Sequence, residues 1–297
     1  MSLEQANHAQ NTHNASGHAT RAGPVEGSKS FSYDFSAGGY GFPQPPKFED
    51  KYAERQYLKG RLAAAFRVFG QKGFDEGVAG HITCRDPVEP HTMWVNPFGV
   101  AFHQMRRSWL LRIDYNGDVL EGGPNKLVNR AAVLIHAAVH KARPDVVCAA
   151  HTHSIFGRTF SVFGIPLPVT SQDGCAFYND VALYDNFEGI VLEGDEGQHI
   201  AQAIGSKKAC ILQNHGLLTA AASVEATVFW FVSLEKLCQT QLLAMAAAAG
   251  GGHQIKAVGD AEAKQSYLSL GQEMSGWFSA KPLFDCIAEE TKEAYLA

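Results

Sequence analysis

The sequence predicts one mixed α/β domain whose sheet is predominantly antiparallel. Short apolar runs of strand length alternate with longer segments in which apolar residues recur at helical spacing. Asn116-Gly117 lies between the apolar runs Leu110–Asp114 and Val119–Leu120, which is typical of a hairpin with antiparallel strands. No repeat and no linker interrupts residues 49–297, and the strands are too numerous for a helical bundle, so a single mixed domain is the simplest interpretation.

The N-terminal region differs from this domain in composition. Residues 1–30 are rich in Asn, His, Ala, Ser, Gly and Gln and hold almost no large apolar residue, which predicts a disordered tail. Residues 31–48 combine aromatic residues with prolines, which predicts an extended arm that packs onto its own body or onto a neighbouring one. The domain proper is then 49–297, including a C-terminal helical extension.

Helices are expected where apolar residues fall on one face and a start or stop signal is present. Gly70 and Gly73 mark the end of the first such segment, and Ser223 is placed to cap the longest one. The predicted helices are 49–72, 125–142, 155–163, 196–204, 224–249 and part of the C-terminal extension, about 260–279.

Strands are expected in the short alternating or continuous apolar runs that turn residues bound. The segment 167–187 lacks such a run and is polar and aromatic, so it is predicted to be an irregular substrate loop. The predicted strands are one within 76–87 and those at 92–96, 110–114, 119–120, 146–151, 209–214 and 217–220.

The strand 146–151 leads into two histidines, His151 and His153. Side chains two residues apart in an extended segment point to the same side, so both imidazoles can converge on one point. His215 follows the apolar run 209–214. A single buried histidine is usually structural, but three that end apolar runs, two of them paired, favour a divalent-metal site with one or two open positions. Zinc is the first choice, with manganese, cobalt or ferrous iron as alternatives.

A metal with an open position would polarise a carbonyl or hydroxyl oxygen of a small-molecule carbonyl substrate and so stabilise an enolate. Aldol cleavage, epimerisation, dehydration and decarboxylation all use that chemistry. The imidazole rings would need partners that fix their tautomer, and the neighbouring side chains of Thr152, Ser154 and Asn214 are candidates.

Charge and cysteine usage argue against several other classes. The formal net charge is −5 and no Lys/Arg cluster is present, so neither nucleic acid nor an anionic membrane is expected as a partner. No apolar run approaches membrane-spanning length and the N-terminus lacks a signal-peptide pattern. The six cysteines are scattered, which indicates reduced thiols and a cytoplasmic protein.

Five short motifs, spread over about residues 50–250, resemble the class II aldolase/adducin family. They are Gly80–Thr83, Asn96–Gly99, Arg143–Asp145, His151–Ser154 and Asn214–Leu217. The family includes sugar-phosphate aldolases related to fuculose-phosphate aldolase, ribulose-phosphate 4-epimerases, a thioribulose-phosphate dehydratase and the adducin heads.

This resemblance implies a three-layer α/β/α sandwich around a central, mostly antiparallel sheet. It implies a fourfold homotetramer with sites between subunits. It also implies that His151, His153 and His215 are the metal ligands, and that the positions of the family's phosphate loops, here Gly80, Asn96, Gly99 and Arg130, bind substrate.

The chain departs from the family at the proton-transfer and phosphate positions. The family aldolases carry an acidic residue where this chain has Ala132. The usual Gly-Asn is Gly80-His81, Phe98 replaces a small hydroxyl residue, and Arg130 stands where the family has a serine. Phe98 removes a phosphate donor, whereas Arg130 suits a carboxylate. These changes predict a substrate that is not a sugar phosphate.

Three residues are candidates for moving the proton. Asp173 in the irregular loop is the first, although it suits turn capping equally well. Tyr178 is the second, with a packed loop aromatic as its alternative. His81 is the third, with a buried, hydrogen-bonded imidazole as its alternative. His136 and His140, at helical i, i+4 spacing, are interpreted as structural.

The favoured hypothesis is therefore a metal-dependent lyase of class II aldolase type that acts through a metal-stabilised enolate on a non-sugar-phosphate carbonyl compound. One alternative is an epimerase or dehydratase at the same metal, which product analysis separates because only cleavage gives two fragments. The other is a non-catalytic, adducin-like interaction protein, which would show no turnover that depends on His153.

Overall fold

The computed structural model describes residues 43–187, 189 and 194–297, all of them within the compact unit Tyr33–Ala297. The predicted tail 1–30 and residues 31–42 of the predicted arm lie outside the described residues. Residues 43–48 of the arm form neither helix nor strand, and the ring centroid of Phe48 lies 5.1 Å from that of Tyr57.

An eight-stranded sheet forms the centre of the domain, with the strands in the order β4-β3-β2-β1-β5-β8-β7-β6. Every pairing is antiparallel except that of β6 with β7. The predicted mixed fold with a mostly antiparallel sheet is thus confirmed. The strands are β1 (His81–Arg85), β2 (Thr92–Val95), β3 (Leu111–Asp114), β4 (Val119–Gly122), β5 (Cys148–Thr152), β6 (Val181–Tyr184), β7 (Ala209–Leu212) and β8 (Gly216–Ala221).

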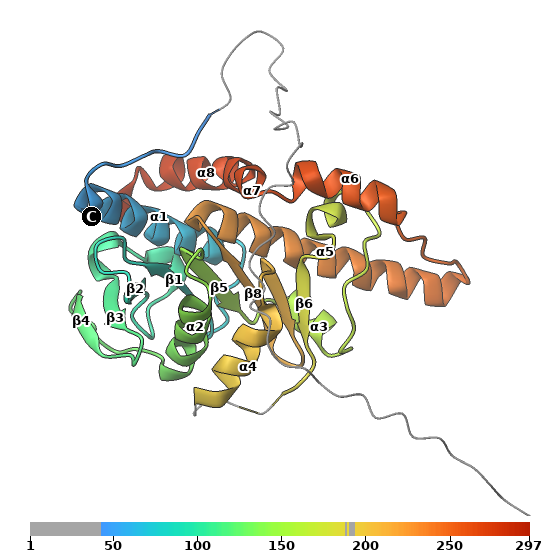
Figure 1. The fold of residues 1–297 in the computed structure, drawn as a ribbon, viewed down its shortest axis with the longest axis horizontal. Coiled ribbons are helices and arrows are strands. Elements are labelled where there is room, and N and C mark those ends of the chain that lie inside the picture. The colour runs from blue at the N-terminus through green and yellow to red at the C-terminus, as the bar shows by residue number, and fades with distance from the viewer. Residues whose placement is uncertain (1–42, 188, 190–193) are drawn as a thin grey trace, which may run out of the picture. The chain divides into compact units, whose positions relative to one another are not determined.

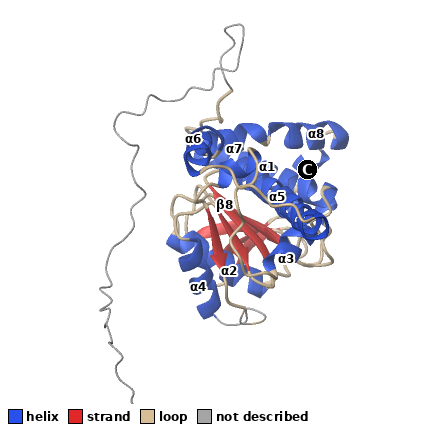
Figure 2. Ribbon diagram, turned by 90° about the vertical axis from the view of Figure 1, so that its right-hand side faces the viewer, coloured by secondary structure: helices blue, strands red, loops and turns tan. Residues whose placement is uncertain are grey.

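Helices cover both faces of the sheet and make the three layers expected for an α/β/α sandwich (Figures 1 and 2). Helices α1 and α5 cover one face, α2 and α4 cover the other, and α6, α7 and α8 lie outside α1 and α5. The helices are α1 (Lys51–Gln71), α2 (Arg130–Ala142), α3 (Ile155–Ser161), α4 (Gly194–Ile204), α5 (Val224–Gly251), α6 (Asp260–Leu270), α7 (Glu273–Ser279) and α8 (Lys281–Thr291).

Alternation along β1 and β5 divides their side chains between the two helical layers. Ile82 and Cys84 join the core under α1 and α5, whereas Ala149 joins the core under α2 and α4. Because strand side chains alternate, His81 and His151 lie on the α2 side of the sheet. The two residues are direct partners in the register of β1 with β5.

The structure corrects three of the predicted boundaries. The segment 167–187 is not wholly irregular, because it contains β6, whose partner β7 is remote in sequence. The second helix begins at Arg130 instead of about 125, because Leu127 accepts a backbone hydrogen bond from Phe98 in a loop. Helix α8 was not predicted; its Pro282 lies in the first turn, where no backbone donor is lost.

A buried ion pair attaches α1 to the sheet. Arg55 of α1 bonds both carboxylate oxygens of Asp86, at 2.8 and 2.9 Å, and the indole of Trp94 donates to the same carboxylate at 2.6 Å. Burial opposes ionisation, but the hydrogen bonds from Arg55, Trp94 and the backbone prevail and lower the pKa of Asp86.

A buried lysine holds the C-terminal extension against the sheet. The ammonium of Lys208 donates to the carbonyl of Gly271 at 2.8 Å, lies 3.2 Å from a carboxylate oxygen of Asp180 and stands 4.0 Å from the ring centroid of Trp230. Tyr267 of α6 also donates to Asp180, at 2.6 Å.

In the described part of the chain, no helix combines the length and the apolar character that a membrane crossing requires.

The Asp86→Ala substitution should lower the free energy of unfolding by about 3–5 kcal/mol, because it leaves the Arg55 charge buried without its partner. Chemical denaturation measures this change. The control is Glu121→Ala, which breaks the more exposed pair with Arg112 and should cost at most about 1 kcal/mol. Equal losses in the two variants would contradict the structural role given to Asp86.

Candidate metal centre

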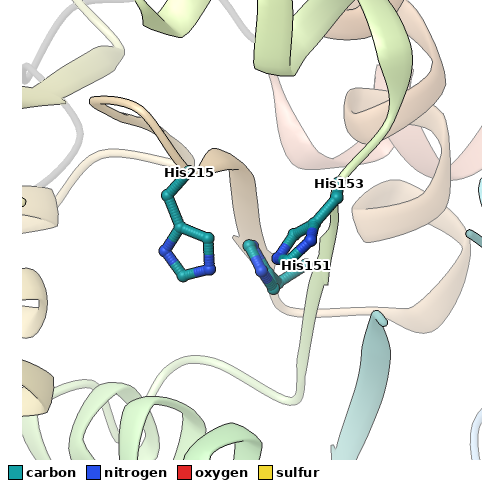
Figure 3. Close-up of side chains that lie close together, drawn as sticks. All are labelled: His151, His153 and His215. Carbon is teal, nitrogen blue, oxygen red and sulfur yellow. The ribbon is translucent and has the colours of Figure 1, made fainter. Parts of the chain in front are cut away.

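Three histidines converge at one end of β5 (Figure 3). His151 lies on β5, His153 follows the strand directly, and His215 occupies the turn between β7 and β8. One potential ligand atom from each histidine lies within 4.8 Å of the other two. The ring centroids are 4.6–5.2 Å apart. The structure therefore brings together the three histidines that the sequence singled out.

A tight turn places His215 against the end of β5. Asn214 and Gly216 both have positive φ angles, of 56° and 156°. A Cβ atom at Gly216 would lie 2.7 Å from the carbonyl oxygen of Thr152, so a larger residue would separate the turn from β5. The turn thus requires glycine next to His215.

The ring of His151 is oriented by a backbone carbonyl. Its Nδ1 atom is 2.8 Å from the oxygen of Leu217 on β8 and donates to it, which leaves Nε2 free to bind an ion. The hydroxyl of Ser154, one of the candidates for such a partner, donates instead to Glu235 at 2.6 Å. The partner of His151 is placed by the strand register, in which Leu217 of β8 pairs with Thr152 of β5. Sequence alone does not give that register.

Burial keeps the three imidazoles neutral. Desolvation, reinforced by neighbouring histidines, lowers the pKa of His151 well below its ordinary value and that of His215 to about 4. Desolvation, with help from the charge of Arg158, also lowers the pKa of His153. Neutral imidazole is the form that binds metals.

The donor set fits a divalent ion. Three neutral imidazoles with ligand atoms this close are the pattern of catalytic zinc sites, and manganese, cobalt and ferrous iron accept the same donors.

A second group of histidines lies beside this cluster. The ring centroid of His81 is 5.2 Å from that of His151 and 4.2 Å from that of His136. The hydroxyl of Thr83 lies 2.7 Å from Nδ1 of His136 and 2.9 Å from Nε2 of His140. His136 and His140 therefore hold α2 to β1, in line with a structural role. Of the three proton-transfer candidates, His81 is the one in ring contact with a predicted ligand.

The other two candidates lie in the segment that carries η3 (Asp173–Phe177). Asp173 is exposed at the start of this short helix. Tyr178 donates a hydrogen bond of 2.5 Å to Asp260, the first residue of α6, and this bond raises the pKa of the phenol. The partner described for Tyr178 thus lies in the C-terminal extension.

The predicted substrate-binding residues lie at loop and strand ends. Gly80 has φ 94° and packs so closely that a Cβ atom would be 3.0 Å from the Thr152 side chain. Asn96 is buried directly after β2, and Gly99 has φ 82° in the loop beyond it. Arg130 is exposed as the first residue of α2.

Sequence reasoning missed Glu235, which is buried on α5 and contacts the segment that follows His153. A signal was available, because Glu235 directly follows the mostly apolar run 226–234 in the longest predicted helix. Its partner is remote in sequence, however, so the pattern alone did not indicate what it contacts.

The metal-free protein should lose stability as the pH falls below about 6.5. Burial lowers the pKa of His215 to about 4 and that of His140 to about 3, so the unfolded chain binds protons before the folded chain does. Each histidine then contributes a slope of up to about 1.4 kcal/mol per pH unit, which ends near its folded pKa. Urea unfolding with a chelator at pH 7.5, 6.5 and 5.5 measures this effect.

The matched variant for that series is His140→Gln, in which the slope between pH 6.5 and 5.5 should be reduced. Carboxylates ionise below this window, so they contribute little to the slope. A free energy of unfolding that stays constant from pH 7.5 to 5.5 would contradict the neutral, buried state of these histidines.

Comparison with known proteins gives a consistent assignment. Residues 60–242 match the model of the Class II Aldolase and Adducin N-terminal domain. The chain is 42% identical to Decarboxylase NovR of Streptomyces niveus, over 82% of this chain and 88% of that protein. It is also 42% identical to the 4-hydroxy-3-prenylphenylpyruvate oxygenase/4-hydroxy-3-prenylbenzoate synthase of Streptomyces roseochromogenus subsp. oscitans, over 82% and 86% of the two chains.

A solved structure agrees with these relatives. The L-fuculose 1-phosphate aldolase from Glaciozyma antarctica PI12 superposes with a TM-score of 0.78, at 46% identity, over 85% of this chain and 96% of that one. These comparisons agree with the five sequence motifs and with the eight-stranded sheet. The chain belongs to the class II aldolase/adducin family.

Proposed function

We propose that this protein is a divalent-metal-dependent enzyme that cleaves a carbon–carbon bond beside a carbonyl group. The convergence of three neutral imidazoles at the end of β5 carries the proposal. An ion held by His151, His153 and His215, zinc in the first instance, would polarise the carbonyl oxygen of a substrate. The protein's own contribution is to hold these rings in place and to keep them unprotonated.

The substrate we propose is a non-phosphorylated 2-oxo acid. Phe98 replaces a phosphate donor of the family, and the loop around it is fixed by the bond from its backbone amide to Leu127, 2.8 Å long. Arg130, exposed at the N-terminus of α2, offers a carboxylate both a guanidinium and the positive end of a helix. Two relatives with 42% identity carry names that refer to decarboxylation and to a phenylpyruvate.

One observation favours a second candidate, the aldol cleavage of a sugar phosphate. The solved structure with 46% identity bears the name of a fuculose-phosphate aldolase. Phe98 and His81 argue against this candidate, because both replace residues that bind phosphate in the family. The two candidates share the metal centre and differ in the anion that the loops recognise.

The structure favours His81 among the three candidates for moving the proton. Its ring lies 5.2 Å from that of His151, so it would serve the site of its own chain. Asp173 and Tyr178 would instead serve the site of an adjoining subunit, in the homotetramer that the family resemblance implies. The bond from Tyr178 to Asp260 would then hold that loop in place.

Product analysis tests the proposed reaction. The metal-loaded protein should cleave an aryl 4-hydroxy-2-oxo acid into an aryl aldehyde and pyruvate, because the ion would stabilise the pyruvate enolate that forms when the bond between C3 and C4 breaks. His153→Ala should lower the rate at least about 100-fold. L-Fuculose 1-phosphate is the comparison substrate. Two three-carbon fragments from it, without turnover of the 2-oxo acid, would favour the second candidate, whereas an isomer or a dehydrated product would contradict cleavage.

Arg130→Met should raise KM for a carboxylate substrate about tenfold with little change in kcat, since about 1.4 kcal/mol of ground-state binding is lost. The control is Arg106→Met, another exposed arginine, whose side chain stacks on Trp109. Steady-state kinetics on the substrate that turns over measures both variants. An unchanged KM in Arg130→Met would remove this residue from the binding site.

A further inference from the structure

Glu235 is a buried carboxylate that bonds to the segment following the predicted ligand His153. It lies on α5, and only 5% of its surface is exposed. Its oxygens accept hydrogen bonds from the hydroxyl of Ser154 at 2.6 Å and from the amides of Phe156 and Gly157 at 2.8 and 2.6 Å. Three short bonds to one carboxylate hold these donors firmly.

The three donors belong to the residues that come directly after His153. Helix α3 begins at Ile155, so the amides of Phe156 and Gly157 are first-turn donors without a partner inside their own helix. Ser154 is the N-cap residue, yet its hydroxyl makes no capping bond and donates to Glu235. The first turn of α3 is therefore capped from another helix, which fixes its position as well as its conformation.

The contacts of Glu235 also extend to His151, through Gly157. A Cβ atom at this position would lie 2.4 Å from the Leu217 side chain and 2.9 Å from a carboxylate oxygen of Glu235. Leu217 in turn provides the carbonyl that accepts a hydrogen bond from His151. Glu235, the start of α3 and the strand segment that orients His151 are thus packed without intervening space.

We propose that Glu235 is a positioning residue for the metal centre and that the affinity of the site for its ion depends on this carboxylate. Glu235 is not a ligand, because among the described residues the convergent group contains only the three histidines. It acts by holding the backbone after His153 and, through Gly157, the segment that orients His151. The inference rests on the proposed metal centre.

Helix α5 offers a matched control in Glu225. This residue is also buried, with 4% of its surface exposed, and it accepts hydrogen bonds from Tyr57 and Arg61 at 2.8 and 2.7 Å. Its partners lie on α1, and no bond described for it reaches α3 or the histidines. Glu225→Gln therefore reports what the loss of a buried carboxylate on this helix does to the fold alone.

The test is the affinity for Co(II), measured by competition with a chelator, together with the visible absorption spectrum of the Co(II)-loaded protein. Glu235→Gln should weaken Co(II) binding about tenfold and alter the spectrum. This is the lower end of the effect of losing a direct partner of a metal ligand, because Glu235 acts on the histidines through the backbone. Glu235→Asp, which keeps the charge, should recover part of the affinity. Glu225→Gln should lower the unfolding midpoint while its Co(II) affinity stays within about twofold of the wild type.

Wild-type affinity and spectrum in Glu235→Gln would overturn the inference while leaving the metal centre standing. The same loss of affinity in Glu225→Gln would also overturn it, because the effect would then be general to buried carboxylates of α5. Failure of the wild-type protein itself to bind Co(II) would refute the proposed metal centre, and the inference with it. If Glu235→Gln does not fold, Glu235→Asp decides the question by the same two readouts.

Discussion

The pairing of β5 with β8 is the constraint on which the site depends. Thr152 pairs with Leu217 in this register, and that pairing sets the turn carrying His215 beside the end of β5. It also aims the carbonyl of Leu217 at His151. A slip of one residue would send every side chain of a strand to the opposite face, so the register and the site are fixed together.

Burial then gives this geometry its chemical character. His151 is buried and His153 and His215 are partly buried, so desolvation disfavours the charged form of each ring. Neutral imidazoles carry no positive charge, so this cluster does not repel a metal cation at neutral pH. The same burial predicts a fold that weakens in acid. The buried pair of Arg55 with Asp86 attaches α1 to the sheet, and Lys208 beside Trp230 holds the C-terminal extension.

Much of this could be predicted from the sequence because its signals were local. The i, i+2 spacing of His151 and His153 at a strand end, the Asn-Gly hairpin and the apolar periodicity of the long helix each lie within one short segment. The convergence of His215 on the pair was expected from the ends of two apolar runs, and the structure brings the three together.

The features that were missed depend on contacts between segments remote in sequence. Strand β6 lies at the edge of the sheet, and its partner β7 is remote in sequence, so its local pattern did not identify it. The partner of His151 is a backbone carbonyl, which residue identity cannot indicate. Glu235 contacts α3 across the packing of two helices, and Tyr178 contacts the C-terminal extension.

The metal content of the protein tests the central claim most directly. The wild-type protein without a histidine tag, a His151→Ala/His153→Ala variant and a His140→Gln control are each reconstituted with zinc, manganese, cobalt or ferrous iron, dialysed, and measured by elemental analysis. The account predicts about one divalent ion per chain in the wild type and the control, and none in the double variant. A wild type that retains no ion, or a double variant that retains it, would contradict the account.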